Sequence, residues 1–371
     1  MKTVCQKDMC SGCGVCIESC FKNAIILNED VKAYNAVINK DLCVNCNKCH
    51  NVCPKNNPAP LVEPSLWQQG WSLDDSIRAK GSSGGLATAI STSFIKEGGA
   101  VCTCKFLNGR FDFYFIKNQE ELLSSSGSKY VKSSPLGIYE EIKIKINNDE
   151  KVLFIGLPCQ VSAVKNYLKN AKIDNLYTID LICHGTPSAK LLEKFLKDYK
   201  IDAKTLSNIK FRAKSNFSLF LNNKEFYKGV QDNYTTAFLT SLSYTENCYD
   251  CDYAQLKRVS DITLGDSWNS DLPSEEIKKG VSLILCQTEK GKRLIDKAQL
   301  KLHPVDLIQA VNANHQLKHP SIKPIKRDLF FNKIKKGYSF NKIMFLVNPV
   351  LETKKIIKRI LSRNKKSNTN K

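Results

Sequence analysis

Cysteine is the residue type whose number and spacing in this chain point most directly to chemistry. The 371-residue sequence contains 16 cysteines, and nine of them lie within the first 53 residues. Residues 1–7 contain no apolar segment, so we expect no secretory signal and a cytoplasmic protein. Thiols stay reduced in that compartment, where clustered cysteines usually bind metal. The sequence therefore predicts metal centres near the N-terminus.

Two arrays of identical spacing account for eight of these nine cysteines. The pattern C-x2-C-x2-C-x3-C occupies 10–20 and recurs over 43–53, with Pro54 directly after it. Three thiolates at this spacing can bind three irons of one [4Fe–4S] cluster, while the fourth is directed to the other cluster. We therefore expect two clusters with crossed ligands. The first set is Cys10, Cys13, Cys16 and Cys53, and the second set is Cys43, Cys46, Cys49 and Cys20.

The two arrays resemble those of bacterial two-cluster ferredoxins, although Phe21 stands where that pattern has proline after the first array. The alternative is a pair of zinc sites with four thiolates each, for which paired C-x2-C is the usual spacing. The remaining cysteine of the region, Cys5, is expected to be an inert thiol.

Four cysteines further along the chain form a third candidate group. The apolar runs 152–155 and 176–182 predict two strands separated by a helix, and a cysteine follows each strand. Strands joined in this way are parallel neighbours, so both thiols should lie at one edge of the sheet. With a later C-x2-C pair they make up the core set: Cys159, Cys183, Cys248 and Cys251. This set could bind a third [4Fe–4S] cluster or zinc, or its first two members could be packing cysteines.

A glycine-rich segment provides a candidate anion site. Residues 82–85 precede a helical pattern in which Leu86, Ile90 and Phe94 recur every four residues. The free N–H groups and the dipole at a helix start favour an anion, and Lys129 could add positive charge. The predicted phosphate-binding residues are Ser82, Ser83, Gly84, Gly85 and Lys129. An ordinary helix capped by serine is the alternative.

Several motifs outside the arrays occur in a characteristic order. They are SSGGLATA from residue 82, SGSKYV from 126, GLPCQ from 156, DLICHG from 180, C-x2-C from 248 and SDITLGDSW from 260. In content and order they resemble the coenzyme F420-reducing hydrogenase/dehydrogenase beta-subunit family, over about residues 1–340. The resemblance implies FAD and electron transfer between clusters and an organic two-electron substrate, either a deazaflavin coenzyme or another acceptor. It also implies a redox partner protein, a ferredoxin or another subunit.

Two interpretations of the whole chain remain open at this stage. The first is an iron–sulfur flavoprotein oxidoreductase, in which His184 is a candidate proton donor or a structural histidine. The second is an electron carrier or docking subunit without substrate chemistry of its own. Asp266 and Trp268 have a simple structural explanation as part of a turn.

The net charge of +20 is unevenly distributed. Residues 316–371 carry +14 of it, and no nucleic-acid recognition motif accompanies them, so we expect no nucleic-acid partner. An apolar helical stripe among lysines lies near the end: Ile356, Ile357, Ile360 and Leu361. This pattern fits contact with an acidic redox protein or an anionic membrane surface, or a solvated helix that packs its stripe on the core. No apolar run approaches the roughly 18 residues that span a bilayer.

Together these patterns predict an α/β fold (α+β overall). Residues 1–57 are expected to form a two-cluster ferredoxin domain. Residues 58–310 should form a FAD and iron–sulfur oxidoreductase core with a partly parallel sheet, divided into 58–145 and 146–310. Residues 311–371 should form a basic helical C-terminal extension.

Overall fold

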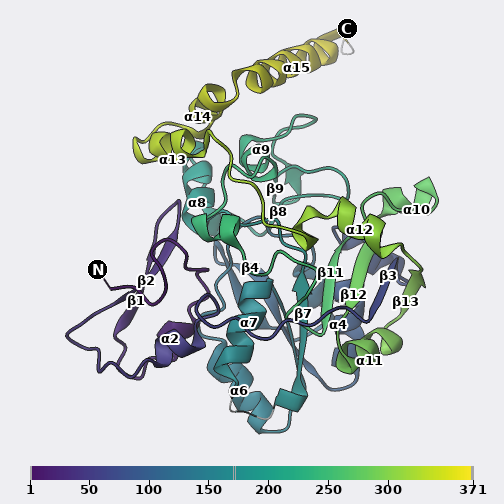
Figure 1. The fold of residues 1–371 in the computed structure, drawn as a ribbon. Helices are drawn as coiled ribbons and strands as arrows, with labels where there is room; N and C mark the ends of the chain where they lie inside the picture. Colours follow the sequence, from purple (N-terminus) through teal and green to yellow (C-terminus); the bar gives the residue numbers. More distant parts are fainter. Residues whose placement is uncertain (1, 170, 172, 369–371) are drawn as a thin grey trace.

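A small N-terminal module lies beside a larger α/β core, and helices gather at the C-terminal end of the computed structural model (Figure 1). The structure describes residues 2–169, 171 and 173–368, with side chains described as far as Lys358. The order of elements confirms the predicted α/β class.

The N-terminal module is built on an antiparallel hairpin of β1 (Ile25–Glu29) and β2 (Tyr34–Ile38). Two short helices, α1 (Val15–Glu18) and α2 (Lys48–Val52), follow the first cysteines of each array. The loop before α1 turns tightly because Gly12 has a φ of 70°, and a Cβ there would lie 3.2 Å from the ring of Tyr34. Glycine thus lets the cysteine loop pass close to the hairpin.

The core contains an eight-stranded sheet in the order β13-β3-β12-β11-β7-β6-β4-β5. Its centre is parallel, as predicted from the β-α-β pattern, and its outer strands are antiparallel. The strands are β3 (Leu66–Ser72), β4 (Ala100–Leu107), β5 (Arg110–Phe115), β6 (Val152–Gly156), β7 (Leu176–Leu181), β11 (Ile262–Asp266), β12 (Ser282–Cys286) and β13 (Leu300–His303). Asn108 and Gly109, a pair typical of tight hairpin turns, join β4 to β5.

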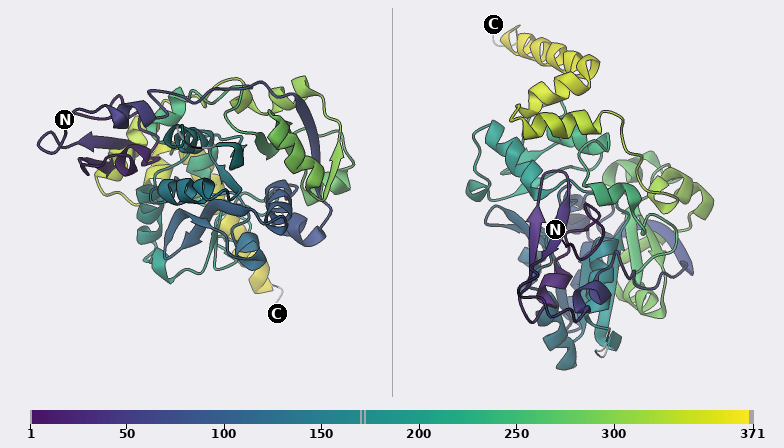
Figure 2. Two further views of the ribbon diagram at one scale, coloured as in Figure 1. Left: turned by 90° about the horizontal axis from the view of Figure 1, so that it is seen from below. Right: turned by 60° about the vertical axis from the view of Figure 1, so that its left-hand side comes forward.

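Both faces of this sheet are covered by helices (Figure 2). Along β6, Val152 and Phe154 pack with α6 (Tyr139–Asn147) and α7 (Pro158–Tyr167). Leu153 and Ile155 point to the other face, which α4 (Leu86–Lys96) and α11 (Glu289–Lys297) cover. A strand buried on both faces must be apolar throughout, which explains the continuous apolar run in the sequence.

A helical cap adjoins the core beyond β7. It contains α8 (Ala189–Asp198), α9 (Asn233–Leu239), α13 (Arg327–Lys335), α14 (Phe340–Val347) and a small sheet of β8 (Ile209–Lys210), β9 (Phe220–Leu221) and β10 (Lys224–Glu225). Ser188 caps α8, because its Oγ accepts from the N–H of Leu191 at 3.2 Å.

The remaining elements of the described chain are the helices α3 (Asp75–Lys80), α5 (Gln119–Ser124), α10 (Ser274–Lys279), α12 (Leu307–Ala313) and α15 (Pro349–Asn368) and the 3-10 turns η1 (Ile173–Asn175), η2 (Ala203–Thr205), η3 (Glu246–Asp250) and η4 (His315–Leu317). None of the helices in the described part has the length and apolar character needed to cross a membrane.

The basic C-terminal segment is continuous with the core over most of its length. Phe330, Phe331 and Phe340 are buried in the cap, so the expected extension 311–371 does not begin as a separate unit. Only α15 extends away from the body (Figures 1 and 2). Its first turns are anchored, because the buried Lys355 donates to Asn233 Oδ1 at 2.6 Å. Within the apolar stripe, Ile356 and Ile357 are exposed, while the side chains of Ile360 and Leu361 lie outside the described ones.

Candidate functional site

The eight array cysteines form two groups in the N-terminal module. Burial raises the pKa of the Cys16 thiol, and three neighbouring sulfurs raise it further: Cys13, Cys10 and Cys53. Burial also raises the pKa of the Cys49 thiol, and three other sulfurs act in the same direction: Cys20, Cys43 and Cys46. Each group combines three cysteines of one array with the fourth of the other. This grouping is compatible with crossed ligation, which stays a prediction.

The two groups differ in depth. All members of the first set are buried, whereas Cys46 of the second set is exposed and its companions are half-buried. Cys49 is close enough to add to the raised pKa of Cys16, so the sets are neighbours. Cys5, which we expect to be an inert thiol, lies beside the first set. It is buried, and hydrogen bonds with Cys10 and Cys53, followed by burial itself, raise its pKa.

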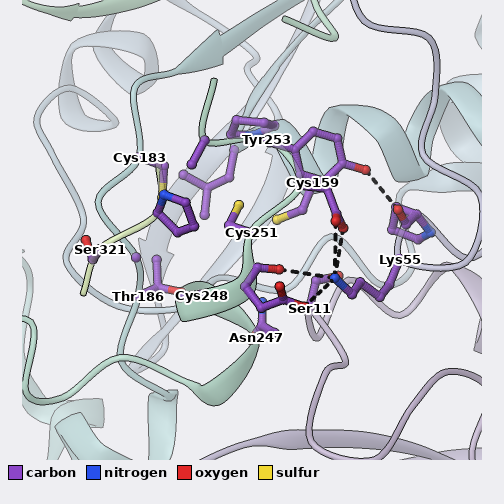
Figure 3. Close-up of a pocket in the computed structure, with 18 of the residues that line it drawn as sticks. Ser11, Lys55, Cys159, Cys183, Thr186, Asn247, Cys248, Cys251, Tyr253 and Ser321 are labelled. Atoms are coloured by element: carbon purple, nitrogen blue, oxygen red, sulfur yellow. Dashed lines mark hydrogen bonds and ion pairs between the residues drawn. The ribbon is translucent and has the colours of Figure 1, made fainter. Parts of the chain in front are cut away.

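The core set gathers at one edge of the sheet. Cys159 lies in the first turn of α7 just after β6, and Cys183 follows β7, as the β-α-β pattern predicted. Cys248 belongs to η3 and Cys251 directly follows it. All four line one pocket (Figure 3). Burial raises the pKa of Cys183, and the other three sulfurs raise it further.

The thiols surround this pocket instead of meeting at a point. Within the described residues, no three Cys, His, Asp or Glu side chains are placed to hold one metal ion. A [4Fe–4S] cluster binds its thiolates at separate corners, and four buried cysteines around a pocket are the donors that it needs. The residues present therefore fit a cluster.

A buried lysine faces the core set. Lys132 is 5% exposed and lines the same pocket. Burial alone would lower its pKa, but the core cysteines, Cys248 first, raise the pKa overall. A buried cation is stable only beside negative charge, which thiolates or a cluster would provide. Sequence analysis missed Lys132, although it stands two residues after Tyr130 in the SGSKYV motif.

An arginine holds the cysteine loop against the sheet. Arg258 pairs with Asp180 of β7 at 2.9 Å, and both side chains are almost fully buried. The same guanidinium donates to the carbonyl oxygens of Tyr253 at 2.7 Å and Leu181 at 3.1 Å. It therefore links the chain just after Cys251 to the end of the strand that precedes Cys183. No local pattern in the sequence marks this role.

The pocket of the core set lies where the N-terminal module meets the core. Pro54 and Lys55, which follow Cys53 of the first set, line it together with the core cysteines. Lys55 forms ion pairs with Asp250 and Asp252 at 3.0 Å each (Figure 3). The hydroxyl of Tyr253 donates to the carbonyl of Pro54 at 3.0 Å. The segments that follow the first set and surround the last cysteines of the core set are thus joined by direct contacts.

A second cavity, of about 640 Å³, adjoins this pocket. Its volume is in the range of sites for large organic ligands. Ser82, Ser83, Gly85 and Lys129 line it, so four of the five predicted phosphate-binding residues share one cavity. We call it the large cavity. Among the other cysteines, Cys104 lines it, whereas Cys102 and Cys286 are buried as expected.

The start of α4 forms part of the wall of the large cavity. Its N-cap is Gly85 at a φ of 80°, and no side chain caps the helix, so the serine-capped alternative does not apply. Ser82 Oγ instead accepts from the N–H of Ser128 at 2.8 Å. Uncapped N–H groups at a helix start suit an anion.

Gly84 differs from its neighbours, because it is absent from the cavity wall. Its N–H donates to Ser282 Oγ at 2.8 Å, and a Cβ would lie 2.3 Å from the carbonyl oxygen of Gly70. Gly84 thus permits close packing of this loop on the sheet. Because its N–H already donates to Ser282, the other four predicted residues are better placed to contact a phosphate.

His184 lines both the pocket of the core set and the large cavity. Its Nδ1 lies 2.6 Å from Nε2 of Gln316, and its ring contacts His315 edge-on. Burial, and then the nearby His315, lower the pKa of His184 to about 4. A neutral ring held by Gln316 is a fixed part of the wall between the two sites.

Aromatic and charged residues form another wall of the large cavity. Arg212 forms a bidentate pair with Asp266, at 2.7 and 3.2 Å. Its guanidinium lies 4.5 Å from the ring of Phe217 and 5.8 Å from that of Trp268. Asp266 and Trp268 therefore do more than form the turn we expected. Such a wall offers flat apolar surfaces and a fixed cation to a planar ligand.

Comparisons with known proteins agree with this layout. Residues 9–57 match the model of the 4Fe-4S dicluster domain. Residues 68–138 match the N-terminal model of the coenzyme F420 hydrogenase/dehydrogenase beta subunit, and residues 149–306 match its C-terminal model. No curated protein matches the chain. One similar solved chain comes from the F420-reducing [NiFe] hydrogenase complex of Methanosarcina barkeri, studied by xenon derivatization. The identity is 18% and the TM-score 0.49, with 75% of this chain and 94% of that chain covered.

Proposed function

Since the chain belongs to the coenzyme F420 hydrogenase/dehydrogenase beta-subunit family, an oxidoreductase family with an added 4Fe-4S dicluster domain here, we propose that it is an iron–sulfur flavoprotein oxidoreductase. It passes electrons between its ferredoxin module and an organic two-electron substrate through FAD, in the cytoplasm. The substrate is a deazaflavin-type coenzyme or another acceptor that reaches the large cavity.

This proposal rests on the fact that the candidate redox sites adjoin one another, from the ferredoxin module through the core set to the large cavity. Pro54, which follows Cys53 of the first set, lines the pocket of the core set and accepts a hydrogen bond from Tyr253. That pocket adjoins the large cavity, and His184 and Leu157 line both. A simple electron carrier has no need of a cavity of about 640 Å³ beside its last metal site.

The residues of the large cavity fit a flavin nucleotide in size and chemistry. The start of α4 and Lys129 would hold the pyrophosphate, because helix N–H groups and a cation favour an anion. Tyr130, Phe217 and Trp268 offer rings for stacking. When bound, FAD exchanges single electrons with clusters and pairs of electrons with an organic substrate.

The chain's own residues would bind and orient these groups. The core set would hold a third [4Fe–4S] cluster, and Lys132 would balance part of its negative charge. Arg258 fixes the loop that carries Cys251. His184 remains the candidate for moving a proton near the flavin, since Gln316 orients its ring at the boundary between the two sites.

The proposal is tested by composition analysis of protein purified without oxygen. We expect bound FAD and about twelve irons per chain, from three clusters of four irons. In Cys248→Ser the iron should fall to about eight. Cys286→Ser is the matched control, since this buried thiol belongs to no set and already bonds to the carbonyl of Thr288. It should retain about twelve irons.

Each alternative predicts a different composition. One zinc lost in Cys248→Ser would make the core set a structural zinc site. Full iron with no flavin would favour an electron carrier or docking subunit. Equal iron in the wild type and in Cys248→Ser, at about eight, would reject the third cluster.

A further inference from the structure

We propose that the exposed surface over the second set is the docking site for an acidic one-electron carrier protein. We call it the docking patch, and it is the face around Cys46 that includes Phe21, Val44, Lys22 and Lys48. The inference rests on the proposed function, because it assigns the point at which electrons enter or leave the chain.

We choose this face because the two sets of ferredoxin cysteines differ in how deeply they are buried. The first set is buried between the hairpin and the core, whereas Cys46 of the second set is exposed. The pocket among the second-set cysteines opens between Phe21 and Val44. Any protein that exchanges electrons with the module from outside therefore reaches the second set first.

Apolar side chains make this face unusual for a surface. Phe21 is 65% exposed and Val44 53%, and both line the second-set pocket. Other apolar residues of the N-terminal module are buried in its interior. An apolar group of this kind next to a redox site is typical of a contact surface for a protein partner.

The positive charge around the second-set pocket indicates that the partner protein is acidic. Lys2, Lys22 and Lys48 line the second-set pocket together with His50, and among the described residues no carboxylate lines it. All three lysines are exposed. Of these lysines, Lys22 and Lys48 flank opposite arrays, so the positive charge surrounds the pocket. An acidic protein surface would be attracted to such a rim and oriented by it.

Electron transfer at this site needs no reactant other than the carrier and the module. The reduced carrier loses one electron, the module gains one electron, and no covalent bond or proton changes place. The carrier is a small acidic iron–sulfur or flavin protein, since such proteins supply electrons one at a time.

The basic helix α15 is the competing docking site. It extends from the cap at the end of the molecule opposite α2, which carries part of the second array (Figures 1 and 2). A carrier bound at α15 would therefore lie away from the second set. We assign the docking to the patch because the patch combines exposed apolar groups, positive charge and a redox site.

The test measures electron entry by anaerobic stopped-flow absorbance at the iron–sulfur bands. The probes are a reduced acidic [2Fe–2S] ferredoxin and reduced methyl viologen, a small donor that needs no docking. The variant is Lys22→Glu/Lys48→Glu. The matched control is Lys278→Glu/Lys292→Glu, which makes the same charge change at exposed positions on α10 and α11.

At low ionic strength, the patch variant should lower the rate constant with ferredoxin by about tenfold or more, within the range of electrostatic steering. The difference should shrink as salt is added. The control variant should stay within about twofold of the wild type, and neither variant should slow reduction by methyl viologen.

Three results would overturn the proposal. One is an unchanged rate in the patch variant, and another is an equal loss in the control variant, since that would reflect net charge alone. The third is a loss of rate on truncation after Lys358 with none in the patch variant, which would place docking at α15. Absence of flavin or of the third cluster would contradict the proposed function but would not alter this measurement, because it follows the clusters of the module.

Discussion

Replacement of Arg258 by methionine should weaken both the fold and the core set. In the structure Arg258 is 2% exposed and Asp180 is fully buried, and they pair at 2.9 Å. Removing one partner of such a pair leaves the other charge uncompensated, which costs about 3–5 kcal/mol. The carbonyls of Tyr253 and Leu181 also lose their donor.

The size of this effect can be measured by thermal unfolding. In a chain of 371 residues, 1 kcal/mol corresponds to roughly 1.3 °C, so we expect Arg258→Met to lower the apparent Tm by roughly 4–6 °C. The loop after Cys251 loses its anchor to β7, so iron should fall by up to about four per chain, one cluster. Arg110→Met is the control, because Arg110 is 74% exposed and pairs with Asp112 at 3.6 Å; its loss should change the stability by under about 1 kcal/mol.

A second substitution separates the ion pair from other effects of the mutation. Asp180→Asn removes the buried negative charge, so adding it to Arg258→Met should cost less than the sum of the two single changes. Our reasoning would be refuted if Arg258→Met melted within about 2 °C of the wild type and kept all its iron, by the same stability arithmetic.

Three further predictions concern individual side chains. Lys132→Met removes a buried positive charge beside the core set and should lower the reduction potential of its cluster by up to about 100 mV, while Lys132→Arg should not; a redox titration followed by electron paramagnetic resonance checks this. Burial, and then Arg78 and Arg212, lower the pKa of Lys214 to about 8. The unfolded chain then binds the extra proton between pH 8 and about 10.5, so stability should rise with pH across this window and the rise should be smaller in Lys214→Met. Cys20→Ser should damage the cluster of the second set and spare that of the first set, and loss of the first-set signal instead would contradict crossed ligation.

Local sequence patterns predicted most elements that position the candidate sites. The apolar run of β6 and the turn at Asn108-Gly109 were recognised because burial on two faces and a tight hairpin each require particular residues nearby in sequence. Two outer strands, β3 and β13, were missed. Both strands are short and lack a strong period of hydrophobic residues. They pair antiparallel with each other, and β3 also pairs with β12, so these contacts join segments far apart in the chain.

The role of some residues depended on what packs against them. Gly84 was expected to contact phosphate, but the carbonyl of Gly70 and the hydroxyl of Ser282 occupy its surroundings. Phe330 and Phe340 were assigned to a separate extension, but they complete the core of the cap. Neither contact leaves a signal in the neighbouring sequence.

The sequence by itself determined the ferredoxin module and its two sets of cysteines, because the ligands of a cluster are fixed by spacing along a few residues. It also determined that Cys159 and Cys183 lie at one edge of the sheet, since parallel strands of one β-α-β unit end at one edge. Only the tertiary structure decided that Lys132 and Arg258 surround the core set and that Arg212 closes the large cavity. Arg258 bonds to Asp180 across 78 positions of the chain, and such a contact is specified by the packing of the whole sheet.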